Sequence, residues 1–201
     1  MQHNTAVTGV RGSLGGLVAV LVLAGMPLPA SDGGSIMNSL LPVAGAQAEQ
    51  DNNVRRTPAM RQNIHKRFSR IRGMADEGKL DSALKSLEQL GSGNLNSYER
   101  AMRWNLEAFL QHQKDNLDAT ATAYQKLLEQ PDLPLSLEQD GWYSLARVES
   151  VRENYSAALD ALNQWFELKE KPGAQAHAMK AQFLYQQKDW NTALTQIDTA
   201  I

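Results

Sequence analysis

The sequence predicts an all-α fold in which about four helix–turn–helix units stack in a row as an α-solenoid. Three observations support this prediction. Small and apolar residues recur at helical spacing in four consecutive stretches, and polar turn residues recur at the same place within each stretch. No stretch shows the polar–apolar alternation that is typical of a β-strand. The four stretches follow an N-terminal region of different composition, which we expect to be a flexible signal and tail.

The N-terminal residues 1–48 have the composition of a secretory signal and its processing region. Arg11 precedes an uncharged apolar run at residues 14–26, and an Ala-Gln-Ala sequence ends at Ala48. The run is shorter than the ~20 residues that a membrane-spanning helix needs. We therefore expect export across a membrane, and for a bacterial chain a periplasmic location. The alternative is an uncleaved signal that anchors the chain in the membrane.

Residues 49–60 are expected to form a linker and residues 61–201 the solenoid, with units at about 64–92, 98–131, 137–170 and 174–201. The first helix of each unit carries a small or apolar residue at one equivalent position, namely Ile71, Ala108, Ala146 and Ala181. The second helix carries a small residue at the reciprocal position, namely Ala83, Thr120, Ala158 and Ala193. These positions mark the point where the two helices of a unit cross closely.

Larger side chains and polar turns complete each unit. The large residues beside the crossing are Trp104 and Trp142 in first helices and Leu87, Tyr124, Leu162 and Ile197 in second helices. Polar breakers such as KDN and REN separate the two helices of a unit, and links rich in Gly, Pro and Asn separate the units. Ser136 and Gln139 form a capping-box pattern, which predicts that the helix bearing Trp142 begins after Ser136.

Composition excludes several kinds of chemistry. The chain of 201 residues contains no cysteine, which rules out disulfides, thiolate catalysis, Cys-ligated zinc and a lipid attached to cysteine. Its net charge of −2 gives no general attraction to nucleic acid. The four histidines are far apart and lack the spacing of metal ligands. We therefore expect a protein that is not an enzyme and that holds no cofactor or metal ion.

The repeated unit resembles the tetratricopeptide repeat (TPR), which is about 34 residues long. The third unit matches that pattern best, with Trp142, Leu145, Ala146, Tyr155, Ala158, Leu162 and Trp165. The second unit departs from it at Thr120, where alanine is usual. The first and fourth units have Arg67 and His177 where the second has Trp104. The resemblance implies a right-handed superhelix with a groove on its concave side, and a function in protein–protein interaction.

In such a superhelix the first helix of each unit lines the groove. The residues expected to face the groove form the candidate peptide- or protein-binding site, and they are Arg72, Asn105, Phe109, His112, Tyr143, Arg147, Gln182 and Tyr185. Asn and Gln side chains pair with the backbone amides of an extended peptide, and Arg pairs with a carboxylate. The alternative is a solvated face that binds nothing.

Three segments resemble a narrower group, the exported bacterial TPR proteins that accompany TonB–ExbB–ExbD energy-transducing systems. The segments are RRTPAMR (55–61), LNSYERAMRWN (95–105) and QPDLP (130–134). The resemblance implies a non-catalytic periplasmic accessory factor for transport that the proton-motive force drives through outer-membrane receptors. Its partners would be TonB-, ExbB- or ExbD-type proteins, and it would contact the membrane only through an uncleaved signal or through a partner.

Two other functions fit the same sequence. The groove would also suit a scaffold for assembly of the outer membrane or the cell wall. The chain would also suit the N-terminal part of a longer protein, whose later part could be catalytic. The fourth unit ends at Ile201 without the polar capping helix that solenoids carry. We therefore expect either a continuation of the chain or the pairing of this end with another molecule.

Overall fold

The computed structural model describes residues 59–201. The predicted signal region, residues 1–48, and most of the predicted linker lie outside the described residues. The described part contains α-helices and no β-strand, which confirms the all-α prediction. Its helices are α2 (Gln62–Asp76), α3 (Leu80–Gly91), α4 (Ser97–Gln113), α5 (Leu117–Leu128), α6 (Leu135–Val151), α7 (Tyr155–Leu168), α8 (Ala174–Gln186) and α9 (Trp190–Ala200).

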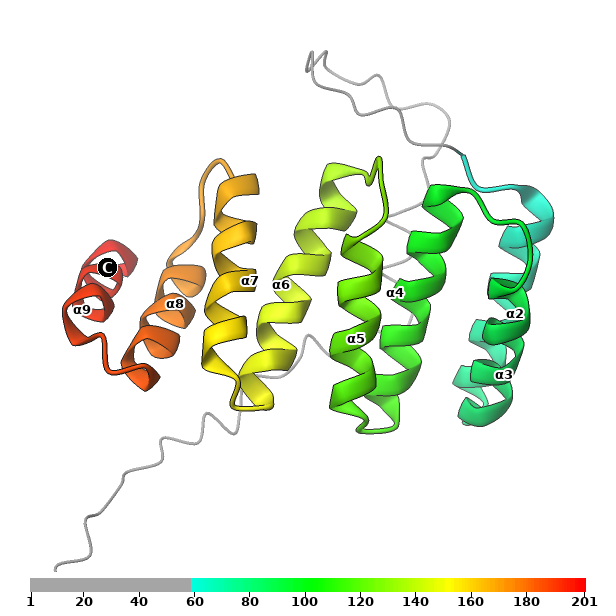
Figure 1. Cartoon of the computed structure of the whole chain (residues 1–201), viewed down its shortest axis with the longest axis horizontal. Coiled ribbons are helices and arrows are strands. Elements are labelled where there is room, and N and C mark those ends of the chain that lie inside the picture. The colour runs from blue at the N-terminus through cyan, green and yellow to red at the C-terminus, as the bar shows by residue number, and fades with distance from the viewer. Residues whose placement is uncertain (1–58) are drawn as a thin grey trace, which may run out of the picture. The chain divides into compact units, whose positions relative to one another are not determined.

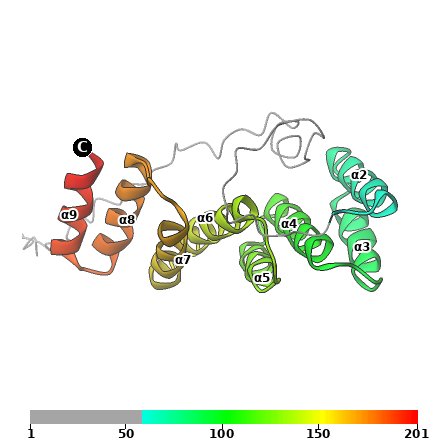
Figure 2. The same cartoon turned by 90° about the horizontal axis from the view of Figure 1, so that it is seen from above.

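The helices form four hairpins, α2–α3, α4–α5, α6–α7 and α8–α9. Each helix packs mainly against the helices that precede and follow it in the sequence (Figure 1). Figure 2 shows α4 and α6 on one side of the row and α5 and α7 on the other. Neighbours in sequence are therefore neighbours in space, which is the arrangement of an α-solenoid. None of the helices among residues 59–201 is long and apolar enough to span a membrane.

The residues predicted at the helix crossings are all buried, and none is more than 4% exposed. In the second hairpin, Ala108 and Thr120 are both fully buried. The Thr120 hydroxyl donates a hydrogen bond of 2.8 Å to the carbonyl oxygen of Asn116, one turn earlier in its own helix. Threonine therefore replaces the usual alanine without leaving an unpaired polar group in the core. The burial of all eight predicted crossing residues is confirmed.

The turn inside each hairpin has the same backbone geometry although its sequence varies. One residue adopts the left-handed conformation two positions before the second helix begins, and these residues are Gly78 (φ 74°), Asp115 (φ 56°), Glu153 (φ 60°) and Lys188 (φ 66°). The next backbone N–H reaches back into the first helix, as where Asn116 N donates to Gln111 O at 3.0 Å. This is the Schellman type of helix ending. A shared turn explains why the spacing inside each unit is constant.

The predicted capping box at Ser136 and Gln139 is wrong. Helix α6 begins at Leu135, directly after Pro134, so Ser136 already lies within its first turn. Proline's fixed φ suits it to the start of a helix, and that start displaces the expected one by two residues. The Gln139 side chain instead donates a hydrogen bond of 2.6 Å to the carbonyl oxygen of Leu168, at the end of α7.

Polar contacts also join successive hairpins along one edge of the row. The turn of each later hairpin contacts the start of the second helix in the hairpin before it. Lys114 pairs with Asp81 in this way. Arg152 pairs with Asp118 at 2.7 Å. Gln187 donates to the carbonyl oxygen of Tyr155 at 3.0 Å. These links add a preferred register to the apolar packing between hairpins.

The crossing at Ala146 yields a test of the fold. Replacing Ala146 by Trp forces a large side chain between α6 and α7, and overpacking of this kind lowers the free energy of unfolding by about 1–3 kcal/mol or more. Urea denaturation followed by circular dichroism measures the loss. Ser136→Trp adds the same side chain at an exposed position of α6 and is the matched control. Equal stability of the two variants would contradict the assigned crossing.

Candidate protein-binding site

The candidate groove residues lie on the first helices of the four hairpins. Arg72 is on α2; Asn105, Phe109 and His112 are on α4; Tyr143 and Arg147 are on α6; Gln182 and Tyr185 are on α8. Seven of the eight are half-buried, and Tyr185 is 58% exposed. They are therefore accessible side chains on an ordered frame rather than core residues. Whether they bind a partner stays a prediction.

Four of these side chains carry an amide or guanidinium group that forms no hydrogen bond and no ion pair within the described part of the fold. Among residues 59–201, Arg72, Asn105, Arg147 and Gln182 form no side-chain hydrogen bond and no ion pair. Each belongs to a different hairpin. Polar groups that already pair within the protein would have to break that pairing before they could bind a ligand. These four have no such pairing to break.

The two tyrosines of the candidate site are each packed against another ring. The ring centroids of Tyr143 and Trp165 are 5.2 Å apart, so Tyr143 is held against α7 of its own hairpin. Tyr185 packs edge-on against Trp190 of α9, with centroids 4.7 Å apart. Such pairs hold the rings in a defined orientation. These two tyrosines are therefore held more firmly than the unpaired amide and guanidinium groups of the candidate site.

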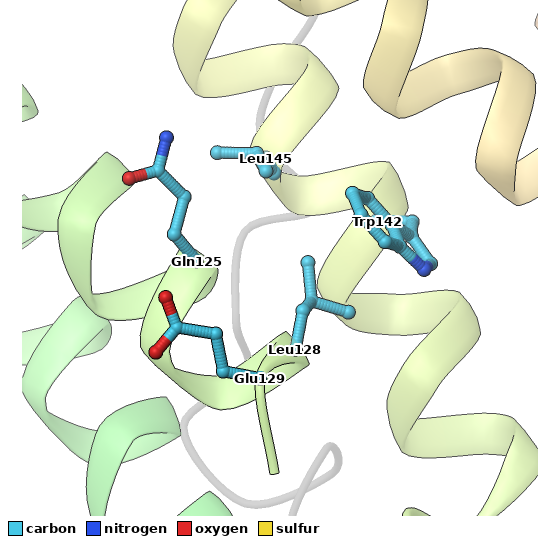
Figure 3. Close-up of a pocket in the computed structure, with 5 residues that line it drawn as sticks. All are labelled: Gln125, Leu128, Glu129, Trp142 and Leu145. Carbon is cyan, nitrogen blue, oxygen red and sulfur yellow. The ribbon is translucent and has the colours of Figure 1, made fainter.

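A pocket between α5 and α6 was not expected from the sequence (Figure 3). Its volume is about 310 Å³, and it is lined by Gln125, Leu128, Glu129, Trp142 and Leu145. Trp142, which the repeat pattern predicts beside the helix crossing, is only half-buried. The signal for close approach at this point is the preceding Gly141. A Cβ atom there would lie 3.0 Å from the Leu128 side chain.

The three segments of the narrower resemblance contact one another in the structure. Arg61, from the first segment, forms an ion pair of 2.6 Å with Glu99, from the second. The Asn96 side chain donates to the carbonyl oxygen of Ala59 at 3.1 Å. Arg100 Nε donates to Gln130 Oε1, in the third segment, at 2.9 Å. Their side chains therefore join successive parts of the solenoid, which is a structural reason for these residues to occur together.

The centre of this network is the fully buried carboxylate of Glu99. Glu99 and Asn96 form a capping box at the start of α4, and Glu99 also accepts hydrogen bonds from the backbone and the guanidinium group of Arg61. Burial of the carboxyl group raises its pKa, but the hydrogen bonds from Arg61 and Asn96 outweigh burial and lower the pKa to about 2. Glu99 is therefore held as an anion.

No cluster of metal ligands adjoins these surfaces in the described residues. Between residues 59 and 201, no group of three His, Asp or Glu side chains is arranged to hold a metal ion. The chemistry that the site offers consists of amide, guanidinium and aromatic groups. Such groups bind polypeptides through hydrogen bonds, ion pairs and ring contacts.

Comparison with known proteins supports the fold. Two solved structures, titled "Crystal structure of MamA" and "Crystal structure of MamA protein", resemble the chain with TM-scores of 0.55 and 0.54. Each is 17% identical and covers 69% of this chain, and the match covers 76% and 71% of the MamA chains. At this identity the likeness shows the fold alone, a TPR-like α-solenoid. No family model and no curated protein matches the sequence.

Glu99 yields a pH-dependent prediction. Because its pKa falls from 4.5 to about 2 on folding, its stabilising effect is present above about pH 5 and is lost as the pH falls toward 2. Glu99→Gln is expected to lower the free energy of unfolding by about 1–2 kcal/mol at pH 7, less than the full pKa shift represents, because Arg61 is partly exposed to solvent. Urea denaturation between pH 7 and pH 3 measures the difference. Glu167→Gln, at an exposed position, is the control, and a difference that does not change with pH would refute the assignment.

The unpaired polar groups yield a second prediction. Asn105→Ala, Arg147→Ala and Gln182→Ala should each change the free energy of unfolding by less than about 0.5 kcal/mol, because no hydrogen bond or ion pair within the fold is lost. Asn96→Ala removes the capping box and should cost about 1 kcal/mol. Thermal denaturation compares the four variants. A loss at Asn105, Arg147 or Gln182 as large as that at Asn96 would show that the side chain serves the fold.

Proposed function

We propose that the protein is a non-catalytic scaffold that binds an extended segment of another protein along the first helices α2, α4, α6 and α8. The observation that carries this proposal is that each first helix has an unpaired amide or guanidinium side chain among its candidate residues. A solvated face would also carry polar groups, but it would not require Arg72, Arg147 and Gln182 to occupy the same position in three of the four hairpins.

The spacing of the site suits an extended polypeptide. Arg72, Phe109, Arg147 and Gln182 each directly follow the crossing residue of their helix, so they occupy equivalent positions in the four hairpins. A chain that runs along the row would meet one of them at each hairpin. Gln182 and Asn105 would pair with its backbone amides, and the two arginines with acidic side chains or a terminal carboxylate.

The frame supports binding because the first helices are already ordered. The buried crossings at Ala108, Ala146 and Ala181 hold each first helix against its partner. Binding therefore costs mainly the conformational entropy that the ligand loses, because the protein loses little. The amide and guanidinium groups keep rotational freedom, which allows small adjustments to different sequences. We infer moderate affinity with a tolerance for related ligands.

The finer proposal concerns place and partner. The apolar run at residues 14–26 supports export, and we propose a periplasmic location for the folded part. The resemblance of the segments at residues 55–61, 95–105 and 130–134 supports a role as an accessory of a TonB-dependent transport system. The side chains of these segments also form contacts within the solenoid. We therefore propose that the partner binds not to the segments but to the candidate residues on α2, α4, α6 and α8, which we call the first-helix face.

A capture experiment tests this function. The wild-type chain is expected to recover a TonB-, ExbB- or ExbD-type protein from envelope extracts, and Arg147→Glu should lose most of it because it reverses a charge at the centre of the site. Lys85→Glu makes the same change at an exposed position of the second helix α3 and should retain capture. Circular dichroism checks that both variants keep their fold.

Two results would contradict parts of the proposal. Capture that survives Arg147→Glu would remove the first-helix face from the binding site. Specific capture of a cell-wall or outer-membrane assembly protein, lost in Arg147→Glu, would retain the scaffold but replace the TonB role with the assembly role.

A further inference from the structure

The beginning of the solenoid carries a concentrated positive charge, most of which the proposed function does not use. No Asp or Glu lies between Asp51 and Asp76. The same stretch contains the basic residues Arg55, Arg56, Arg61, Lys66, Arg67, Arg70 and Arg72. Residues 76–201, by contrast, hold 12 Lys and Arg and 19 Asp and Glu. The small net charge of the chain is therefore the sum of a basic stretch before residue 76 and an acidic remainder after it.

Three of these cations share one side of α2, and we call them the basic face: Lys66, Arg67 and Arg70. All three are exposed. Within residues 59–201 none of them forms an ion pair or a side-chain hydrogen bond. The opposite side of α2 is buried through Ile64, Phe68 and Ile71. The basic face is thus turned away from the core and is not neutralised by it.

Comparison with α6 shows what the basic face replaces. The positions in α6 that correspond to Lys66, Arg67 and Arg70 are Gly141, Trp142 and Leu145. In α6 these positions face the preceding hairpin: Gly141 lies close to Leu128, and Trp142 and Leu145 line the pocket against α5. No described hairpin precedes α2. The basic face is therefore the end surface of the described row, at the place where other hairpins stack.

The charge of this surface exceeds what an end cap requires. A capping surface needs polar residues, and mixed charges would serve it well. Lys66 and Arg70 instead place like charges four positions apart, an arrangement that destabilises a helix. Arg67 adds a third charge of the same sign beside them. A run of one sign that works against its own helix indicates an interaction with an anionic partner.

We propose that the basic face docks the solenoid end-on against an anionic lipid surface. One exposed side of a helix suits a flat array of phosphate groups, which arginine binds with two parallel hydrogen bonds. Helix layers are about 8–10 Å apart, and charges are screened beyond about 8–10 Å at physiological salt. The acidic residues of the later hairpins therefore do not cancel the attraction between the basic face and an anionic lipid surface.

The sequence before α2 favours a lipid surface over an acidic polypeptide. The apolar run at residues 14–26 precedes the basic stretch and supports a position at a membrane, as a signal in transit or as a retained anchor. When it is retained as an anchor, the apolar run forms with the basic face the two-part attachment that membrane-surface proteins commonly need. Arg72 is not part of the basic face, so end-on docking through that face would leave the candidate residues of the first helices free for the polypeptide that we propose as ligand.

Vesicle binding by the full chain tests the proposal. Wild type should bind phosphatidylcholine vesicles that contain phosphatidylglycerol better than pure phosphatidylcholine vesicles, and added salt should weaken the preference. The triple variant Lys66→Gln, Arg67→Gln, Arg70→Gln should lose roughly 100-fold in affinity for the anionic vesicles, from about fivefold for each cation near the surface. The matched triple variant Lys85→Gln, Lys169→Gln, Lys171→Gln changes the net charge equally at exposed positions and should retain binding.

The design separates the basic face from the apolar run. Any insertion of residues 14–26 is common to all variants and to both vesicle types, so only the dependence on anionic lipid reports the basic face. Equal losses in the two triple variants would overturn the proposal. The proposal would also be overturned if the wild-type protein showed no preference for anionic vesicles but was retained on polyglutamate. That result would assign the basic face to an acidic polypeptide.

Orientation is tested with single labels, since the chain has no cysteine of its own. A fluorophore on Asn63→Cys, beside the basic face, should become shielded from a soluble quencher when anionic vesicles are added. The same fluorophore on Asn191→Cys, an exposed position of α9, should remain accessible. Shielding at position 191 instead of position 63 would contradict end-on docking through α2.

Discussion

The close crossing of two helices at small side chains is the contact on which the rest of the solenoid depends. Ala108, Ala146 and Ala181 are buried against the second helices of their hairpins, where Thr120, Ala158 and Ala193 occupy the reciprocal positions. Larger side chains at these points would hold the helices apart and open voids beside them. The crossing also sets which side of each first helix remains exposed. The candidate site is a consequence of this geometry.

Polar contacts place one hairpin against the next. Apolar packing between hairpins has little directional preference, whereas hydrogen bonds and ion pairs need a defined geometry. Arg152 with Asp118 joins two hairpins along one edge, and Arg61 with the buried Glu99 joins the start of the solenoid to α4. The buried carboxylate is satisfied by several donors, so it stabilises a single arrangement instead of leaving an unpaired charge. The packing within hairpins and the polar contacts between them together fix the positions of the hairpins, so that equivalent side chains recur at regular intervals along the row.

Different surfaces of the molecule carry different kinds of chemical group. The first-helix face carries amide, guanidinium and aromatic groups at intervals along the row, which suits an extended polypeptide. The end surface on α2 carries charge of one sign, which suits a charged plane. The far hairpin instead exposes apolar residues such as Leu194 and Ile197 on α9. In α5 and α7 the residues equivalent to Ile197 are Tyr124 and Leu162, which the following hairpin helps to cover. The ends of the row therefore differ in chemistry although their backbones are alike.

The sequence by itself determined the helical class, the four hairpins and the crossing residues, because each follows from short-range spacing on a helix. It also placed the eight candidate site residues on first helices, since a residue's face follows from its distance to the crossing. Only the tertiary structure decided what lies between hairpins. The pocket behind Gly141 and the Arg61–Glu99 pair both depend on contacts between distant segments. Local periodicity carries no information on such contacts, because the positions of two segments in space are set by the packing of everything between them.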